Sequence, residues 1–149
     1  MKQLILFLSI ALALTSCSND DSDPSKVAFK TIIQGAHYGG SPGTIQQSNL
    51  VIKNQTDWNN LQAKLNFMTL AVYTSPDMNV DFTKQQVIAV FDQVRNSGGY
   101  SIDITNITQN NTELIVKIEQ LKKGDLTTVM SQPFHIVKIA KTNKTVVFK

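Results

Sequence analysis

The sequence predicts a strand-rich α+β domain, with roughly seven mostly antiparallel strands in a sheet or sandwich and one main helix packed on it. Three observations predict this class. Apolar and polar residues alternate in several short segments, residues 87–91 are apolar throughout, and one stretch has helical spacing. Because the chain has 149 residues, we expect a single globular domain, which we assign to residues 27–149.

The strand assignments follow the alternation. Residues 87–91 have no polar position, which predicts a central strand covered on both faces. Asn110-Asn111 separates two alternating segments and predicts a tight hairpin, since asparagine tolerates positive φ. Residues 35–43 hold four of the seven glycines and are expected to form a loop. The expected strands are 27–33, 50–52, 87–91, 101–107, 114–118, 134–139 and 146–148.

The one helical pattern begins after Thr56, which we expect to be the N-cap. Apolar side chains then recur three and four residues apart, which places them on one helix face. We expect this face to pack on the sheet rather than to line a ligand pocket. The stripe consists of Trp58, Leu61, Leu65, Met68 and Val72.

The first sixteen residues are expected to be a lipoprotein signal peptide. Lys2 precedes an apolar run from Leu4 to Leu14, which is shorter than the ~20 residues of a membrane-spanning helix. The next residues, Leu14-Thr15-Ser16-Cys17, resemble a bacterial lipobox. We therefore expect Cys17, the only cysteine, to be lipidated and to become the first mature residue.

We expect residues 17–26 to form an acidic tether that links the lipidated cysteine to the domain. Ser18 after the cysteine resembles lipoproteins sorted to the outer membrane. We expect an outer-membrane protein, anchored by its lipid and facing either the periplasm or the cell surface. Removing Lys2 and the three tether aspartates raises the net charge from +3 to +5, but the lysines are dispersed, and we expect no nucleic-acid partner.

Residues suited to catalysis or metal binding are few. His37 lies in the glycine-rich segment and His135 in a strand pattern, and neither accompanies a nucleophile motif such as Gly-x-Ser-x-Gly. Asp77 and Asp81 are a possible acid–base pair, but aspartates that flank a helix and form turns are the far commoner explanation. We therefore predict no enzyme activity, no catalytic residues, no metal site and no cofactor.

The second half of the chain resembles the PrcB C-terminal domain family. The resemblance covers residues 81–149 and rests on the order and spacing of short motifs, with an upstream segment around Trp58 that often precedes them. The motifs are Asp81-Phe82, Val87–Phe91, Ser97-Gly98-Gly99-Tyr100-Ser101-Ile102, Leu114 with Val116, Gly124, Gln132-Pro133-Phe134-His135-Ile136-Val137-Lys138 and Val146-Val147-Phe148.

The namesake of this family is a lipoprotein that stabilises a secreted protease complex. The resemblance therefore implies a non-catalytic protein-binding module that stabilises or regulates such a complex. Arginine and aromatic residues commonly anchor interfaces, so two loops, 95–100 and 131–135, are the candidate interaction sites. Their residues of interest are Arg95, Gly98, Gly99, Tyr100, Pro133, Phe134 and His135. Turn chemistry alone is the simpler explanation of the glycines and of Pro133.

Three other functions stay open. The Gly-Tyr and Pro-aromatic segments resemble loops of chagasin-like protease inhibitors. A hydrolase would need a pocket that gathers His37 or His135 with a carboxylate. A small-ligand or glycan binder would need exposed aromatic side chains on one concave face, for which the chain offers Trp58, Tyr38, Tyr73 and Tyr100.

Overall fold

A computed structural model describes residues 24–38, 45–66 and 76–149. Within these ranges it contains eight strands, one α-helix and a short 3-10 helix. The elements in chain order are β1 (Ser25–Lys26), β2 (Phe29–Tyr38), β3 (Ser48–Ile52), α1 (Gln55–Asn66), η2 (Pro76–Met78), β4 (Gln85–Phe91), β5 (Asp103–Gln109), β6 (Glu113–Glu119), β7 (Ser131–Ala140) and β8 (Thr145–Phe148). The strand-rich α+β class is confirmed.

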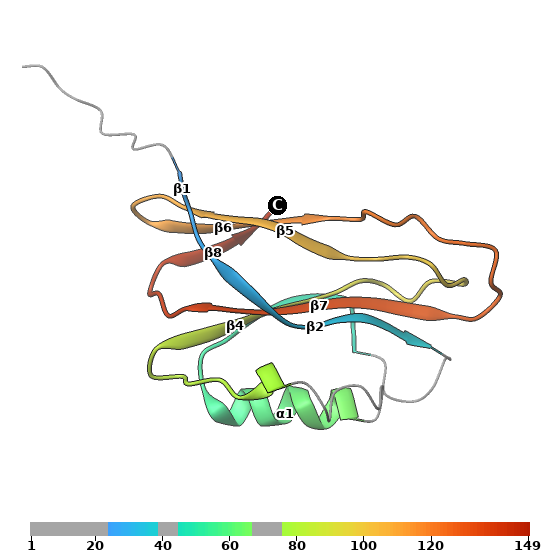
Figure 1. Ribbon diagram of the computed structural model, residues 1–149, viewed down its shortest axis with the longest axis horizontal. Coiled ribbons are helices and arrows are strands. Elements are labelled where there is room, and N and C mark those ends of the chain that lie inside the picture. The colour runs from blue at the N-terminus through green and yellow to red at the C-terminus, as the bar shows by residue number, and fades with distance from the viewer. Residues whose placement is uncertain (1–23, 39–44, 67–75) are drawn as a thin grey trace, which may run out of the picture.

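The strands form two four-stranded sheets that stack face to face (Figure 1). Sheet A has the order β1-β5-β6-β8, and sheet B has the order β2-β7-β4-β3. All neighbouring strands are antiparallel except β6 and β8, which are parallel. Helix α1 lies on the outer face of sheet B, so sheet B is the middle layer (Figure 1).

The middle position of sheet B explains its apolar central strand. Val87, Ala89 and Phe91 of β4 face the helix, whereas Ile88 and Val90 face sheet A. All five are essentially inaccessible to solvent. The prediction of a strand covered on both faces is therefore confirmed. Because both faces of this strand are covered by other layers, its side chains on both faces are apolar.

Helix α1 buries the predicted stripe but begins earlier than predicted. Trp58, Leu61 and Leu65 are buried against sheet B, and the Trp58 indole donates to the Met78 carbonyl at 3.1 Å. The cap is Asn54, whose side-chain oxygen accepts from the Asp57 amide at 2.9 Å. Thr56 lies inside the helix, so its assignment as N-cap was wrong. Met68 and Val72 lie outside the described residues.

Three further expectations are corrected. Strand β2 continues through the first part of the glycine-rich segment, because Gly35 to Tyr38 pair with β7. Ser25 and Lys26, assigned to the tether, pair with β5 as β1. The β5–β6 hairpin is confirmed, but without positive φ at an asparagine, since the Asn110 side chain accepts from the Glu113 amide at 2.7 Å instead.

The signal peptide, Cys17 and most of the tether lie outside the described residues. Within the described ranges, no helix is long and apolar enough to cross a membrane.

Candidate interaction site

The two candidate loops meet at one end of the sandwich, which we call the loop end. It holds the ends of β2, β4 and β6 and the start of β7 (right side of Figure 1). The Arg95 amide donates to the Ser131 carbonyl at 2.7 Å, and the Ser131 amide donates back at 3.0 Å. The Asp92 amide also donates to the Pro133 carbonyl at 2.9 Å. The backbone itself therefore joins the loops.

The glycine pair lets a second segment approach the first loop. Gly99 has a φ of 73°, and the Gly124 and Asp125 amides donate to the Gly99 and Gly98 carbonyls at 3.2 and 3.0 Å. A Cβ on Gly99 would lie 2.6 Å from the Asp125 carboxyl carbon. We call residues 97–101 and 122–127, held together in this way, the loop clasp.

Gly124 makes room in the clasp for a side chain of the first segment, as Gly99 does for the second segment. Its φ is 100°, and a Cβ there would lie 2.6 Å from the Tyr100 ring. The motif Gly-Gly-Tyr and the later Gly124 are therefore one structural unit, in which each glycine makes room for a side chain or backbone of the other strand. The positive φ angles and close contacts of Gly99 and Gly124 are therefore explained by backbone conformation alone, which was the simpler of the two explanations offered by the sequence.

Asp125 and Thr127 close the clasp. Asp125 accepts from both the Thr127 amide, at 2.9 Å, and the Thr127 hydroxyl, and this hydroxyl oxygen accepts from the Gly98 amide at 3.1 Å. The hydrogen bonds from Thr127 lower the pKa of Asp125, with the hydroxyl contributing most. The carboxylate is therefore ionised and fixed in its role as an acceptor.

The Arg95 side chain bonds within the protein and is not presented to a partner. Its Nε and Nη2 donate to one Asp92 oxygen at 2.9 and 2.7 Å, and the same oxygen accepts from Gln120 at 3.0 Å. The guanidinium also lies 5.0 Å from the Tyr100 ring centroid. With side chains only 20% and 4% exposed, Arg95 and Asp92 form a structural pair beneath the loop end.

The expectation that the second loop presents Phe134 and His135 is wrong. Both residues lie within β7, an inner strand of sheet B, and are 1% and 4% exposed. Phe134 stacks on Phe91 in the core beneath α1, with ring centroids 6.0 Å apart. Pro133 is also buried, near the start of the same strand. These three side chains have almost no accessible surface with which to contact a partner.

His135 faces the other way and ties the two sheets together. Its Nδ1 accepts from the Ile104 amide at 2.9 Å, and its Nε2 lies 2.9 Å from the Thr31 hydroxyl. Because Nδ1 is an acceptor, the neutral ring carries its proton on Nε2 and donates it to Thr31. This tautomer cannot take a proton from Thr31, so the pair is not a base and nucleophile. Burial lowers the pKa of His135 and keeps the ring neutral, although Asp103 acts in the opposite direction.

Asp77 and Asp81, which the sequence offered as an acid–base pair, are each engaged by other side chains. Asp77 forms ion pairs with Lys30 at 2.7 Å and Lys138 at 3.4 Å, which lower its pKa, the hydrogen bond from Lys30 most strongly. Hydrogen bonds from Thr83 lower the pKa of Asp81. Neither carboxyl is held in the protonated form that a general acid requires. Among the described residues, no three His, Cys, Asp or Glu side chains gather as a metal site.

The exposed apolar side chains of the loop end were not predicted from the sequence. In the described part of the chain, every exposed large apolar side chain lies in the last residue of β2, in the segment after β4 or in the segment between β6 and β7, all of which belong to the loop end. The signal in the sequence was the segment 121–130, which has apolar residues but neither strand nor helix periodicity. The set, which we call the apolar loop surface, consists of Tyr38, Val94, Leu121, Leu126, Val129 and Met130.

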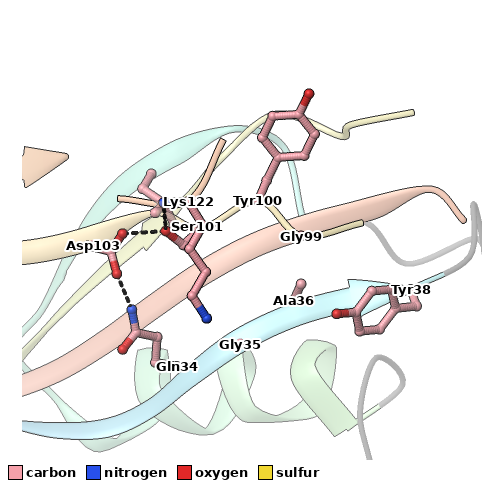
Figure 2. Close-up of a pocket in the computed structure, with 10 residues that line it drawn as sticks. Gln34, Gly35, Ala36, Tyr38, Gly99, Tyr100, Ser101, Asp103 and Lys122 are labelled. Carbon is pink, nitrogen blue, oxygen red and sulfur yellow. Dashed lines mark hydrogen bonds between the residues drawn. The ribbon is translucent and has the colours of Figure 1, made fainter. Parts of the chain in front are cut away.

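A pocket of about 380 Å³ lies between the sheets beside this surface (Figure 2). On one side it is lined by Gln34 to Ala36 and Tyr38 of β2, and on the other by residues 99–103 and Lys122. The Asp103 carboxylate is engaged within it by Gln34, Ser101 and the Leu121 amide. The Lys122 side chain extends toward β2, whereas the Tyr100 ring points away (Figure 2).

The fold and the loop end define a helix-covered β-sandwich with an exposed loop surface. Residues 86–140, from β4 to the end of β7, match the family model described as PrcB C-terminal. The resemblance to that family is confirmed over these residues, which include the loop clasp. No curated protein and no solved structure matches the chain.

Proposed function

We propose that this protein is a non-catalytic protein-binding module that is anchored to the outer membrane through Cys17 and binds a secreted protease complex through the apolar loop surface. The single observation that carries the proposal is the gathering of exposed apolar side chains at one end. Contiguous exposed apolar patches mark interaction sites, since water contact disfavours them in a protein that acts alone.

The construction of the loop end supports the same proposal. Leu126 is fully exposed and follows the clasp residue Asp125, which is held by the Gly98 carbonyl and by Thr127. A loop held at its base presents its apolar side chains with little loss of backbone freedom on binding. Arg95 and Tyr100 support this surface from below, so their role is to position the loops.

The burial of Pro133 to His135 removes support for the inhibitor alternative. The resemblance to chagasin-like inhibitors required a Pro-aromatic loop that reaches a protease, and the structure has a core strand at that position. The glycan-binding alternative is not supported either, because the described aromatic side chains do not form one exposed concave face. Trp58 is buried in the helix core, the Tyr100 ring turns away from the pocket, and Tyr73 lies outside the described residues.

The test is cross-linking of the full-length lipoprotein in its own membrane, followed by gentle extraction and mass spectrometry. We expect a protease subunit to co-purify with the wild type and to be reduced at least fivefold with the double variant Leu126→Ser, Val129→Ser. The variant Asn111→Ser, at the exposed hairpin on the opposite end, is the matched control and is expected to behave as the wild type. Equal capture by all three proteins, or a monomer in every case, would contradict the proposal.

A further inference from the structure

Leu126 is the most exposed member of the apolar loop surface. Its side chain is 101% exposed, whereas the other five members are between 38% and 66% exposed. Among the residues that the structure describes, the backbone amide and carbonyl of Leu126 form no hydrogen bond either. Both the side chain and the backbone of this residue are therefore available to another molecule.

The chain on the two sides of Leu126 is held by one residue of the loop clasp, Gly98. Before Leu126, the Asp125 amide donates to the Gly98 carbonyl at 3.0 Å. After it, the Thr127 hydroxyl oxygen accepts from the Gly98 amide at 3.1 Å. Asp125 and Thr127 also bond to each other across Leu126, since the carboxylate accepts from the Thr127 amide at 2.9 Å and from the Thr127 hydroxyl. Leu126 is therefore the apex of a loop whose base is fixed on both sides.

A fixed loop with one projecting side chain suits the active-site cleft of a protease. A serine protease takes the side chain that precedes the scissile bond into its primary specificity pocket. A side chain on a fixed loop enters that pocket with little loss of conformational entropy. When the bond after it is hydrolysed, a fixed base keeps the two new ends side by side, so the loop is released slowly. Such a loop therefore inhibits the protease, whereas a flexible loop is a substrate.

We propose that Leu126 enters the primary specificity pocket of the secreted protease and that the loop clasp makes the loop around it inhibitory. The inference rests on the protease-binding function proposed above and names the part of the protease that is bound. An apolar pocket accepts leucine, whereas the acidic pocket of trypsin-like enzymes requires lysine or arginine, so the protease is one that cuts after large apolar residues. This loop is separate from the buried segment 133–135, on which the resemblance to chagasin-like inhibitors depended.

The test measures how the full chain inhibits chymotrypsin and subtilisin, which have apolar primary pockets, and trypsin, which has an acidic one, on small chromogenic substrates. We expect saturable inhibition of chymotrypsin or subtilisin and none of trypsin. Leu126→Arg is expected to reverse this selectivity, with inhibition of the apolar-pocket enzyme weakened at least about tenfold and trypsin inhibition gained. Leu121→Arg, at another exposed leucine of the same surface, is the matched control and is expected to behave as the wild type.

A second measurement distinguishes an inhibitory loop from a substrate. With the inhibited enzyme, the wild-type loop is expected to stay intact. The double variant Asp125→Ala, Thr127→Ala, which loses the side-chain bonds across Leu126, is expected to be hydrolysed between residues 126 and 127, as mass spectrometry of the fragments shows.

Three results would overturn this mode of recognition: no inhibition of either apolar-pocket enzyme, rapid hydrolysis of the wild-type loop, or unchanged selectivity of Leu126→Arg. If the cross-linked partner nevertheless depends on Leu126 and Val129, the proposed function stands and only the inference about the protease pocket is wrong. Loss of that dependence together with any of these three results contradicts both.

Discussion

At the scale of single residues, His135 is the most informative side chain because it is a titratable group placed between two sheets. Burial lowers its pKa, so the folded protein keeps it neutral at pH values where the unfolded chain binds a proton. Below the usual value of 6.5, the unfolded state therefore gains protons that the native state does not. We expect the free energy of unfolding to be highest above pH 6.5 and to decrease as the pH falls below it, as measured by urea denaturation.

The control for this pH dependence is substitution of His135. His135→Gln is expected to remove the slope between pH 5 and 6.5. The carboxyls with a lowered pKa are Asp77, Asp81, Glu119 and Asp125, whose usual values are 3.8 and 4.5. Their contribution to stability is therefore lost mainly below about pH 5, outside this window. A slope that survives in His135→Gln would refute the assignment.

Gly99 yields a second prediction at this scale. Alanine there would have to hold a φ of 73° and to place its Cβ 2.7 Å from the Asp125 amide nitrogen. We expect Gly99→Ala to lower the free energy of unfolding by about 1–3 kcal/mol, the usual cost of such backbone strain. Gly35→Ala is the matched control, because among the described residues its Cβ would meet only the Phe134 ring, at 3.9 Å. Urea denaturation that gave equal losses for the two variants would show that the clasp does not need its glycine.

At the scale of elements, the N-cap of α1 is the clearest difference between the sequence-based prediction, Thr56, and the structure, in which Asn54 is the cap. Asn54 bonds the Asp57 amide and, through its side-chain nitrogen, the Asp57 carboxylate at 2.7 Å. We expect Asn54→Ala to destabilise the protein by about 1 kcal/mol, as loss of an N-cap does. Thr56→Ala, at the position that the sequence suggested, is expected to change stability by less than about half of that. Thermal unfolding followed by circular dichroism checks both, and the reverse order would restore Thr56 as the cap.

The elements also show how far the sequence could predict the fold. Periodicity was sufficient for β4 to β7 and for Trp58, Leu61 and Leu65, because burial on a strand or helix face imposes it directly. It failed for Gly35 to Tyr38, where glycine suggested a loop while pairing with β7 held the chain extended. Local patterns contain no information on such long-range pairing.

The candidate site was predictable only in part, for a related reason. The glycines of the clasp belong to motifs that the sequence contains, whereas the meeting of the two segments follows only from the backbone hydrogen bonds between Arg95 and Ser131. Phe134 and His135 looked like loop anchors because Pro133 precedes them, and only the sheet order shows that β7 is an inner strand. The exposed Leu126 and Met130 have no periodic signal, since their exposure results from the clasp that holds the loop outward.

At the scale of the whole molecule, the chain enters the sandwich far from the apolar loop surface. Ser25 and Lys26 pair with Gln109 and Thr108, next to the β5–β6 hairpin, and this hairpin and the loop end lie at opposite ends (Figure 1). A lipid anchor at Cys17, as proposed, would therefore hold the hairpin end nearer to the bilayer. The apolar loop surface would then point away from the membrane, where a secreted partner can reach it.

This orientation makes a prediction for the anchored protein. Ser18 to Pro24 extend at most about 25 Å, so the tether limits how far the hairpin end can move from the lipid surface. The lipidated protein is reconstituted in vesicles containing an acceptor dye, with a donor dye on a cysteine introduced by Asn111→Cys or Leu126→Cys. We expect stronger energy transfer from position 111 than from position 126, because the loop end is further from the anchor on time average. Adding Cys17→Ser is expected to remove transfer from both positions, since no anchor remains. Equal transfer from the two anchored proteins, or stronger transfer from position 126, would mean that the loop surface faces the membrane and that its apolar side chains contact lipid instead of a protein.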